Sequence, residues 1–178
     1  SRLSQRHARL LVAAKGDLYL NGLSELSDDV ANILGAHEHD LYLDGLQSLA
    51  PTAAEGLSAC KGNLSLNGLT TIDDQTAASL SHHEGWLHLD GLSRMPRQVA
   101  HHLSQHKGTG LALNGLKSIS ESAKTCLLQY RGTLEVSGFV HDAVAELFRG
   151  RQHALDAPVE EALAEKASST ASDTLLSQ

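Results

Sequence analysis

Leucine alternates with polar or small residues in six short segments of the chain. The segments are LYLNGL at 18, LYLDGL at 41, LSLNGL at 64, LHLDGL at 87, LALNGL at 111 and the divergent LEVSGF at 134. An apolar residue at every second position is typical of a strand that buries one face. We therefore predict a short strand in each segment.

The segments recur with a nearly constant period. Successive intervals between the polar residues that precede the glycines are 23, 23, 23, 24 and 23 residues. A period between 20 and 50 residues indicates units that stack on one another. An ordinary globular α/β domain is the alternative, but it has no reason to keep the columns in phase. The residues that define the period are Asn21, Asp44, Asn67, Asp90, Asn114 and Ser137.

A helix is expected after each strand. Val30, Ala31 and Leu34 have the spacing of one buried helical stripe. A column of alanines, in which a small side chain lets the helix lie close to the sheet, comprises Ala8, Ala31, Ala54, Ala77 and Ala100. Residues suited to helix starts are Asp28, Asp73 and Ser120 as caps, and Pro51 and Pro96 in first turns.

Each of the six segments has a glycine directly after its Asn, Asp or Ser residue, where the predicted strand ends. These glycines are Gly22, Gly45, Gly68, Gly91, Gly115 and Gly138. Asn-Gly and Asp-Gly pairs favour sharp turns in which the glycine has a positive φ. We therefore predict such a turn at the end of each strand.

Three regions follow from this pattern. Residues 1–15 have only the helical half of a unit, from a preceding repeat or an amino-terminal cap, and residues 16–149 form about six repeats. Residues 150–178 are expected to hold one more helix, at 156–167, and a disordered tail.

The repeat resembles the short bacterial leucine-rich repeat. This resemblance implies a right-handed α/β solenoid with parallel strands on the concave face and short helices on the convex face. It also implies binding to a protein partner, whose identity it does not reveal. The pattern departs from the family in one column, where leucine replaces the usual asparagine and the Asn or Asp lies two residues earlier. The leucines in that column are Leu23, Leu46, Leu69, Leu92 and Leu116.

Composition excludes several function classes. The net charge of −7 and the lack of a basic stripe argue against binding to nucleic acid or to anionic membranes. No apolar run approaches the roughly 20 residues of a membrane span, so no membrane insertion is expected. Cys60 and Cys126 lie three repeats apart, too far for a disulfide.

A polar column near the helix ends suggests metal chemistry. It includes His37, Cys60, His83 and His106, and His and Cys are suitable zinc ligands. We favour the simpler interpretation, in which a histidine at a helix C-terminus donates to free carbonyls and needs no metal. The next column alternates in charge, with Lys15, Glu38, Lys61, Glu84, Lys107 and Arg131, and is interpreted as structural.

The sequence gives no support for catalysis. No Gly-x-Ser-x-Gly motif occurs, and no serine or cysteine lies beside a base and an orienting acid. We therefore expect neither an enzyme nor a cofactor.

The outward positions of the strands, called the strand face below, are the candidate binding surface. They are 17, 19, 21; 40, 42, 44; 63, 65, 67; 86, 88, 90; 110, 112, 114; and 133, 135, 137. Aromatic rings among acids and amides can bind a protein. The predicted binding residues are Asp17, Tyr19, Asp40, Tyr42, Trp86 and His88. Alternatively, Tyr19 and Tyr42 merely cover each other as a cross-strand pair.

These patterns together predict a protein-interaction scaffold without enzymatic activity. The alternatives are a structural spacer within a larger repeat protein and, third, a metal-binding module on the histidine column.

Overall fold

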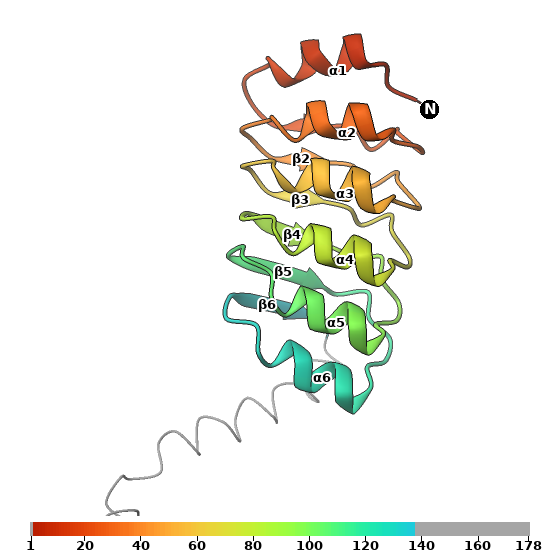
Figure 1. Ribbon diagram of the computed structural model, residues 1–178, viewed down its shortest axis with the longest axis vertical. Helices are drawn as coiled ribbons and strands as arrows, with labels where there is room; N and C mark the ends of the chain where they lie inside the picture. Colours follow the sequence, from red (N-terminus) through yellow and green to blue (C-terminus); the bar gives the residue numbers. More distant parts are fainter. Residues whose placement is uncertain (1, 138–178) are drawn as a thin grey trace, which may run out of the picture. The chain divides into compact units, whose positions relative to one another are not determined.

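The structure, a computed structural model, describes residues 2–137. The predicted end of the last repeat, the helix at 156–167 and the tail lie outside the described residues. Helices and strands alternate along the chain (Figure 1). The helices are α1 (Gln5–Val12), α2 (Asp28–Leu34), α3 (Pro51–Ser58), α4 (Asp74–Leu80), α5 (Arg97–Leu103) and α6 (Glu121–Leu127). The strands are β1 (Leu18–Tyr19), β2 (Leu41–Tyr42), β3 (Leu64–Ser65), β4 (Trp86–His88), β5 (Gly110–Leu113) and β6 (Thr133–Val136).

The strands form one parallel sheet in chain order, β1-β2-β3-β4-β5-β6. The first leucine of each segment lies opposite the first leucine of the next segment, through Leu18, Leu41, Leu64, Leu87, Leu111 and Leu134. This register confirms the predicted strands and columns. It gives a solenoid-like arrangement, in which each winding of the chain runs through one strand and one helix.

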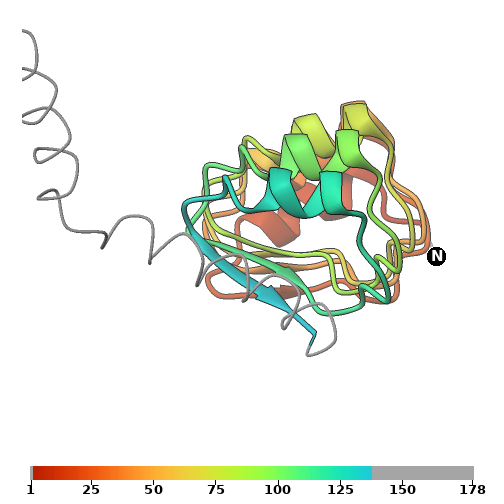
Figure 2. The ribbon, with the colours of Figure 1, turned by 90° about the horizontal axis from the view of Figure 1, so that it is seen from below.

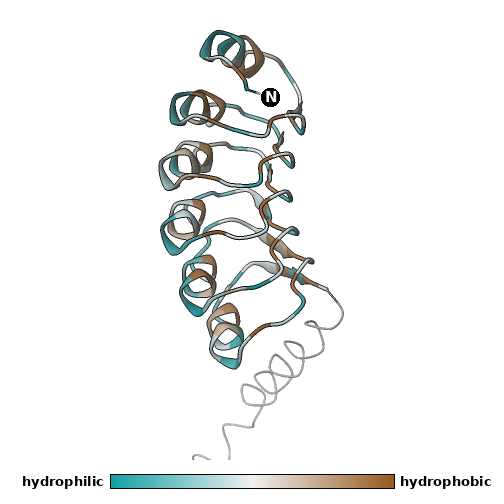
Figure 3. Cartoon of the chain, turned by 90° about the vertical axis from the view of Figure 1, so that its right-hand side faces the viewer, coloured by the Kyte–Doolittle hydropathy of each residue, from teal (hydrophilic) through white to brown (hydrophobic). Residues whose placement is uncertain are grey.

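Helices and strands form two layers. The helices lie side by side on one side of the windings, and the sheet lies on the other (Figures 2 and 3). The interior between the layers is lined by leucine and alanine. Leu41, Leu64 and Leu87 are fully buried, as are all five members of the alanine column. The core is therefore shared between windings, since each one contributes the same few apolar side chains.

The helix starts agree with the sequence in three of five cases. The Asp73 and Ser120 side chains accept hydrogen bonds from backbone N–H groups in the first turns of α4 and α6, and Pro51 is in the first turn of α3. The predictions for Asp28 and Pro96 are wrong by one residue each. Ser27, which is extended, is the cap before α2, and Pro96 itself is the cap before α5.

The predicted turn geometry is wrong for five of the six glycines after the strands, Gly22, Gly45, Gly68, Gly91 and Gly115, whereas Gly138 lies outside the described residues. Among the described residues, positive φ occurs only at Gly16, where φ is 108°. The glycines are needed for another reason. A Cβ atom added at Gly45, Gly68 or Gly91 would lie 2.1, 2.2 or 2.1 Å from a backbone carbonyl oxygen of the preceding winding. Glycine at this position therefore lets successive windings approach closely.

The two cysteines lie apart in the core. Cys60 and Cys126 are both free thiols, as expected from their separation of three repeats, and the structure shows that both are buried. Burial raises the pKa of the Cys60 thiol.

Candidate binding surface on the strand face

The Asn and Asp residues after the strands form a ladder of hydrogen bonds between windings, called the Asn/Asp ladder below. Each Oδ1 atom accepts a bond from the backbone N–H at the same position of the next winding. The distances are 2.9 Å from Asp44 to Asn21, 2.9 Å from Asn67 to Asp44, 2.8 Å from Asp90 to Asn67 and 2.8 Å from Asn114 to Asp90. The side chains thus continue the sheet beyond the short backbone strands.

A second ladder lies at the start of the strands. The N–H of Asp40 donates to Asp17 Oδ1 at 3.3 Å, the N–H of Asn63 to Asp40 Oδ1 at 2.8 Å, and the N–H of Trp86 to Asn63 Oδ1 at 3.0 Å. Asp17 and Asp40, both predicted binding residues, therefore also hold the windings together. Asn63, predicted to point outward but not included among the predicted binding residues, links Asp40 to Trp86. Its place in the same column was the signal that could have identified it.

Tyr19 and Tyr42 form the most prominent aromatic feature of this surface. Their rings stack with centroids 4.4 Å apart and planes 6° from parallel. Tyr19 remains 67% exposed, whereas Tyr42 is half-buried and its hydroxyl points to Asp40 Oδ2 at 3.5 Å. Burial, Tyr19 and then the Asp40 carboxylate raise the pKa of Tyr42. The cross-strand pairing considered from the sequence is present, but it leaves one ring open to solvent.

The other two predicted binding residues form a separate pair. Trp86 and His88 stack at a centroid distance of 5.7 Å, and both are half-buried. The indole lies over Gly110, where a Cβ atom would be 2.1 Å from Trp86 Cδ2. Strand β3 separates this pair from the tyrosines, a distance of about 10 Å across two strand spacings. The six predicted residues thus form two clusters on one face.

The face is polar between these clusters. Ser65 is buried, and its hydroxyl donates to Asp44 Oδ1 at 2.6 Å and accepts from Asn67 Nδ2 at 3.0 Å. Ala112 is also buried. Ser65 and Ala112 belong to the middle outward column of the strand face, which comprises positions 19, 42, 65, 88, 112 and 135. The expectation that this column points to solvent is therefore wrong at these two positions.

The histidine column lies inside the fold, between windings. His37 Nε2 is 3.0 Å from the Gly16 carbonyl, and His106 Nε2 is 3.2 Å from that of Gly85. A carbonyl only accepts, so both Nε2 atoms are the donors. Tyr130 occupies the next place in the column, and its hydroxyl donates to the Gly108 carbonyl at 2.8 Å. His37 and His106 thus donate to a carbonyl as expected, but the carbonyl belongs to the preceding winding, so the predicted partner at the helix end is wrong.

His83 differs from its neighbours in this column. It is fully buried, and neither ring nitrogen has a hydrogen-bond partner among the described residues. Its ring stacks on that of His106 at 6.1 Å. Burial lowers the pKa of both imidazoles, so both are neutral near pH 7. Within residues 2–137, no group of three His, Cys, Asp or Glu side chains is arranged to hold a metal ion.

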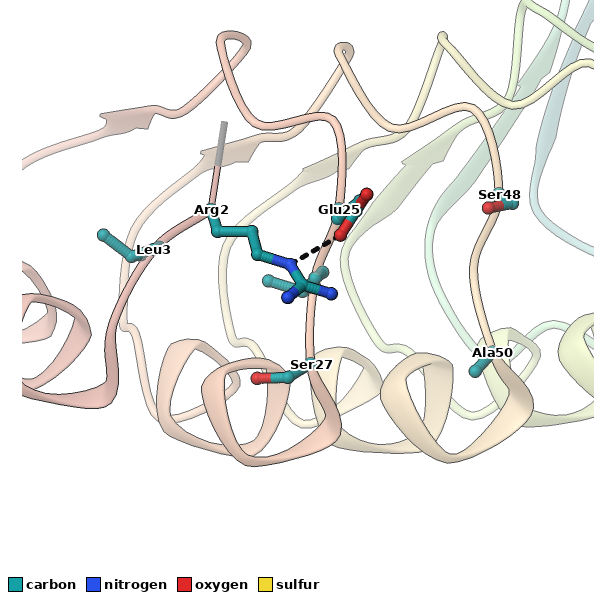
Figure 4. A pocket seen from close by; sticks show the side chains of 7 residues that line it. Arg2, Leu3, Glu25, Ser27, Ser48 and Ala50 are labelled. Atoms are coloured by element: carbon teal, nitrogen blue, oxygen red, sulfur yellow. Dashed lines mark hydrogen bonds and ion pairs between the residues drawn. The ribbon is translucent and has the colours of Figure 1, made fainter.

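A surface pocket of about 430 Å³ lies near the starts of α2 and α3 (Figure 4). The Arg2 guanidinium reaches into it and pairs with Glu25. Both side chains are mainly exposed, so this ion pair contributes little to stability. None of the predicted binding residues lines the pocket.

Of the helices in the described part, none has the length and apolar character needed to cross a membrane. Comparison of the sequence with protein-family models finds no match, and comparison with curated proteins finds none either.

Proposed function

We propose that this chain is a leucine-rich-repeat scaffold that recognises a protein partner through its strand face and has no enzymatic activity. The fold half of this proposal is a right-handed solenoid with the strands on the concave side. It is supported by the 23-residue unit, by the leucine columns that share one interior, and by the parallel sheet with all described helices on the other side. Such an arrangement leaves one broad surface for binding.

The observation that carries the binding half is the exposed tyrosine stack. Tyr19 and Leu10 are the large apolar side chains that remain exposed among the described residues, each at 67%. Leu10 lies on helix α1, away from the strand face, whereas Tyr19 belongs to an aromatic stack on that face beside Asp17 and Asp40. A rigid aromatic side chain with a polar rim is a common binding hot spot.

Affinity capture from a lysate of the source organism, with the whole chain as bait, tests this function. Replacing Tyr19, Tyr42 and Trp86 by alanine should release a captured protein, because these are the tyrosine and tryptophan side chains of the face and such rings dominate interface energetics. Leu10→Ala is the matched control, since it removes an equally exposed apolar side chain from the helix side. Equal capture by all variants with unchanged circular dichroism would refute the strand face as the binding surface.

A structural spacer is the second candidate, and the two ladders favour it. Asp17, Asp40, Asn63 and Asp44 all use side-chain oxygens to join windings, which is sufficient reason for polar residues at these positions. Deleting residues 64–86 removes one unit and joins two equivalent positions. A spacer would lose stability in proportion to repeat number and keep its function. A recognition scaffold would lose its partner, because Trp86 is removed and the remaining contacts move.

A further inference from the structure

The strand face is charged with one sign only. Of its eighteen positions, five are acidic, namely Asp17, Asp40, Asp44, Asp90 and Glu135, and none is Lys or Arg. All 14 Lys and Arg residues of the chain are elsewhere in the sequence. Because like charges on neighbouring strands repel, a cation from outside would relieve an unfavourable arrangement.

The ladders do not neutralise these charges. Asp17, Asp44 and Asp90 accept their hydrogen bonds from backbone N–H groups or a serine hydroxyl, all of which are neutral. Three ion pairs are found within the described residues, and each joins residues away from the strand face: Arg2 with Glu25, Lys61 with Glu38, and Lys124 with Glu121. The carboxylates of Asp17, Asp44 and Asp90 thus remain available to a basic group, whereas both oxygens of Asp40 accept hydrogen bonds from Asn63 and Tyr42.

The tyrosine stack gives a cation a defined position. The Tyr19 ring is exposed, and its other face is covered by Tyr42 at 4.4 Å. Asp17 and Asp40 stand two residues before the two tyrosines, at the same end of strands β1 and β2. A planar guanidinium can stack on an aromatic ring and reach a carboxylate at its edge, which an ammonium group does less well.

The remaining acids require more than one cation. Asp40 precedes strand β2 and Asp44 follows it, so the two lie four residues, or about 13 Å, apart. Asp90 follows β4, two strands on, at about 10 Å from Asp44. A ligand that meets Asp17, Asp44 and Asp90 must therefore carry several positive charges along an extended length.

We propose that the partner of the strand face is a basic, arginine-containing protein segment, with one arginine lying on the open face of the Tyr19 ring and pairing with Asp17. This inference rests on the proposed function, since it identifies the class of partner for the same surface. The other positive residues of the segment pair with Asp44 and Asp90.

A randomised peptide display library, panned against the whole chain, tests the inference and does not require the partner to be identified. Enriched peptides should be rich in arginine, with lysine second, and should bind more weakly as salt is raised. Enrichment of uncharged or acidic peptides that still depend on Tyr19 would overturn the basic partner while leaving the proposed function intact. A lack of any binder, or binders unaffected by Tyr19→Ala, would count against both.

Charge-neutral variants then test the role of the carboxylates. Asp17→Asn, Asp44→Asn and Asp90→Asn, combined in one protein, keep every Oδ1 acceptor of the ladders. Asn already occupies the place equivalent to Asp17 at Asn63, and the places equivalent to Asp44 and Asp90 at Asn21 and Asn67. This variant should bind an enriched peptide roughly tenfold more weakly or worse.

The matched control carries the same change in net charge on the helix side. It combines Asp28→Asn, Glu55→Gln and Asp74→Asn, all of them exposed residues of α2, α3 and α4. Binding of the enriched peptide should stay within about twofold of the wild type. Equal losses in the two triple variants, with both folded by circular dichroism, would show that net charge alone matters and would overturn the arginine site.

Discussion

Gly22 and Gly68 occupy the same place in their repeats, yet alanine should have opposite effects at the two positions. At Gly68 the new Cβ atom would lie 2.2 Å from the Asp44 carbonyl oxygen and 2.5 Å from that of Leu46. Ordinary contacts begin near 3.4 Å, so the windings would have to separate by about 1 Å. Both opposing atoms are backbone and cannot rotate away.

The expected cost of Gly68→Ala is at the upper end of overpacking, about 2–3 kcal/mol of unfolding free energy. Gly22 has no preceding strand in the structure, and nothing lies within 4 Å of a Cβ atom there. Its φ is not positive, so alanine fits the backbone without strain. Gly22→Ala should stabilise the fold by about 0.4–1 kcal/mol, because it restricts the unfolded chain.

Urea unfolding followed by circular dichroism compares the two variants directly. The midpoint should fall for Gly68→Ala and stay constant or rise for Gly22→Ala, while the slope of the transition is unchanged. Equal destabilisation at both positions would refute the reasoning, because it would mean that the turn itself requires glycine. Gly45→Ala and Gly91→Ala repeat the test, since the added Cβ atoms would lie 2.1 Å from the equivalent carbonyl oxygens of Asn21 and Asn67.

Three further predictions concern the polar groups between windings. Tyr130→Phe leaves the buried Gly108 carbonyl without its donor and should cost about 1–3 kcal/mol in urea unfolding, whereas His83→Leu removes an unpartnered polar group and should be neutral or stabilising. Asn67→Ala should cost about 1 kcal/mol of unfolding free energy and Asn67→Asp much less, since only aspartate keeps the Oδ1 acceptor for Asp90; equal losses would refute the ladder. Burial lowers the pKa of His83 and His106 below 6.5 in the folded chain, so the unfolded chain binds protons first as the pH falls. The free energy of unfolding should therefore have its full value above about pH 6.5 and decrease below it. The limiting slope is about 1.4 kcal/mol per pH unit for each imidazole, and unfolding midpoints that do not change between neutral and mildly acidic pH would contradict it.

The sequence alone determined the elements and their register. Alternating leucines predict strands, the apolar stripe around Val30 and Leu34 predicts a helix, and the 23-residue period predicts which leucines lie opposite one another. These features were predictable because they depend on local periodicity and on repetition. A side chain that recurs at a fixed interval must meet its own copies when the windings stack.

The candidate site was predictable only in part. Tyr19 and Tyr42 could be placed together because they share a column on adjacent strands, and the structure stacks them. The separation of Trp86 and His88 from them follows from the number of intervening strands. By contrast, the sequence does not show that Asp17 and Asp40 bond to backbone N–H groups, because an outward column can face either solvent or the next winding.

Only the tertiary structure decided what the glycines, the Asn/Asp ladder and the histidine column do. Each depends on the distance between windings, which no pattern within one unit specifies. At Gly68 a carbonyl of the preceding winding leaves no room for a methyl group, and at Asn67 the next winding brings an N–H within 2.8 Å. His37 likewise meets a carbonyl that is 21 residues away in the chain. The amino-acid pattern specifies which residues recur, whereas the close approach of successive backbones determines which atoms they contact.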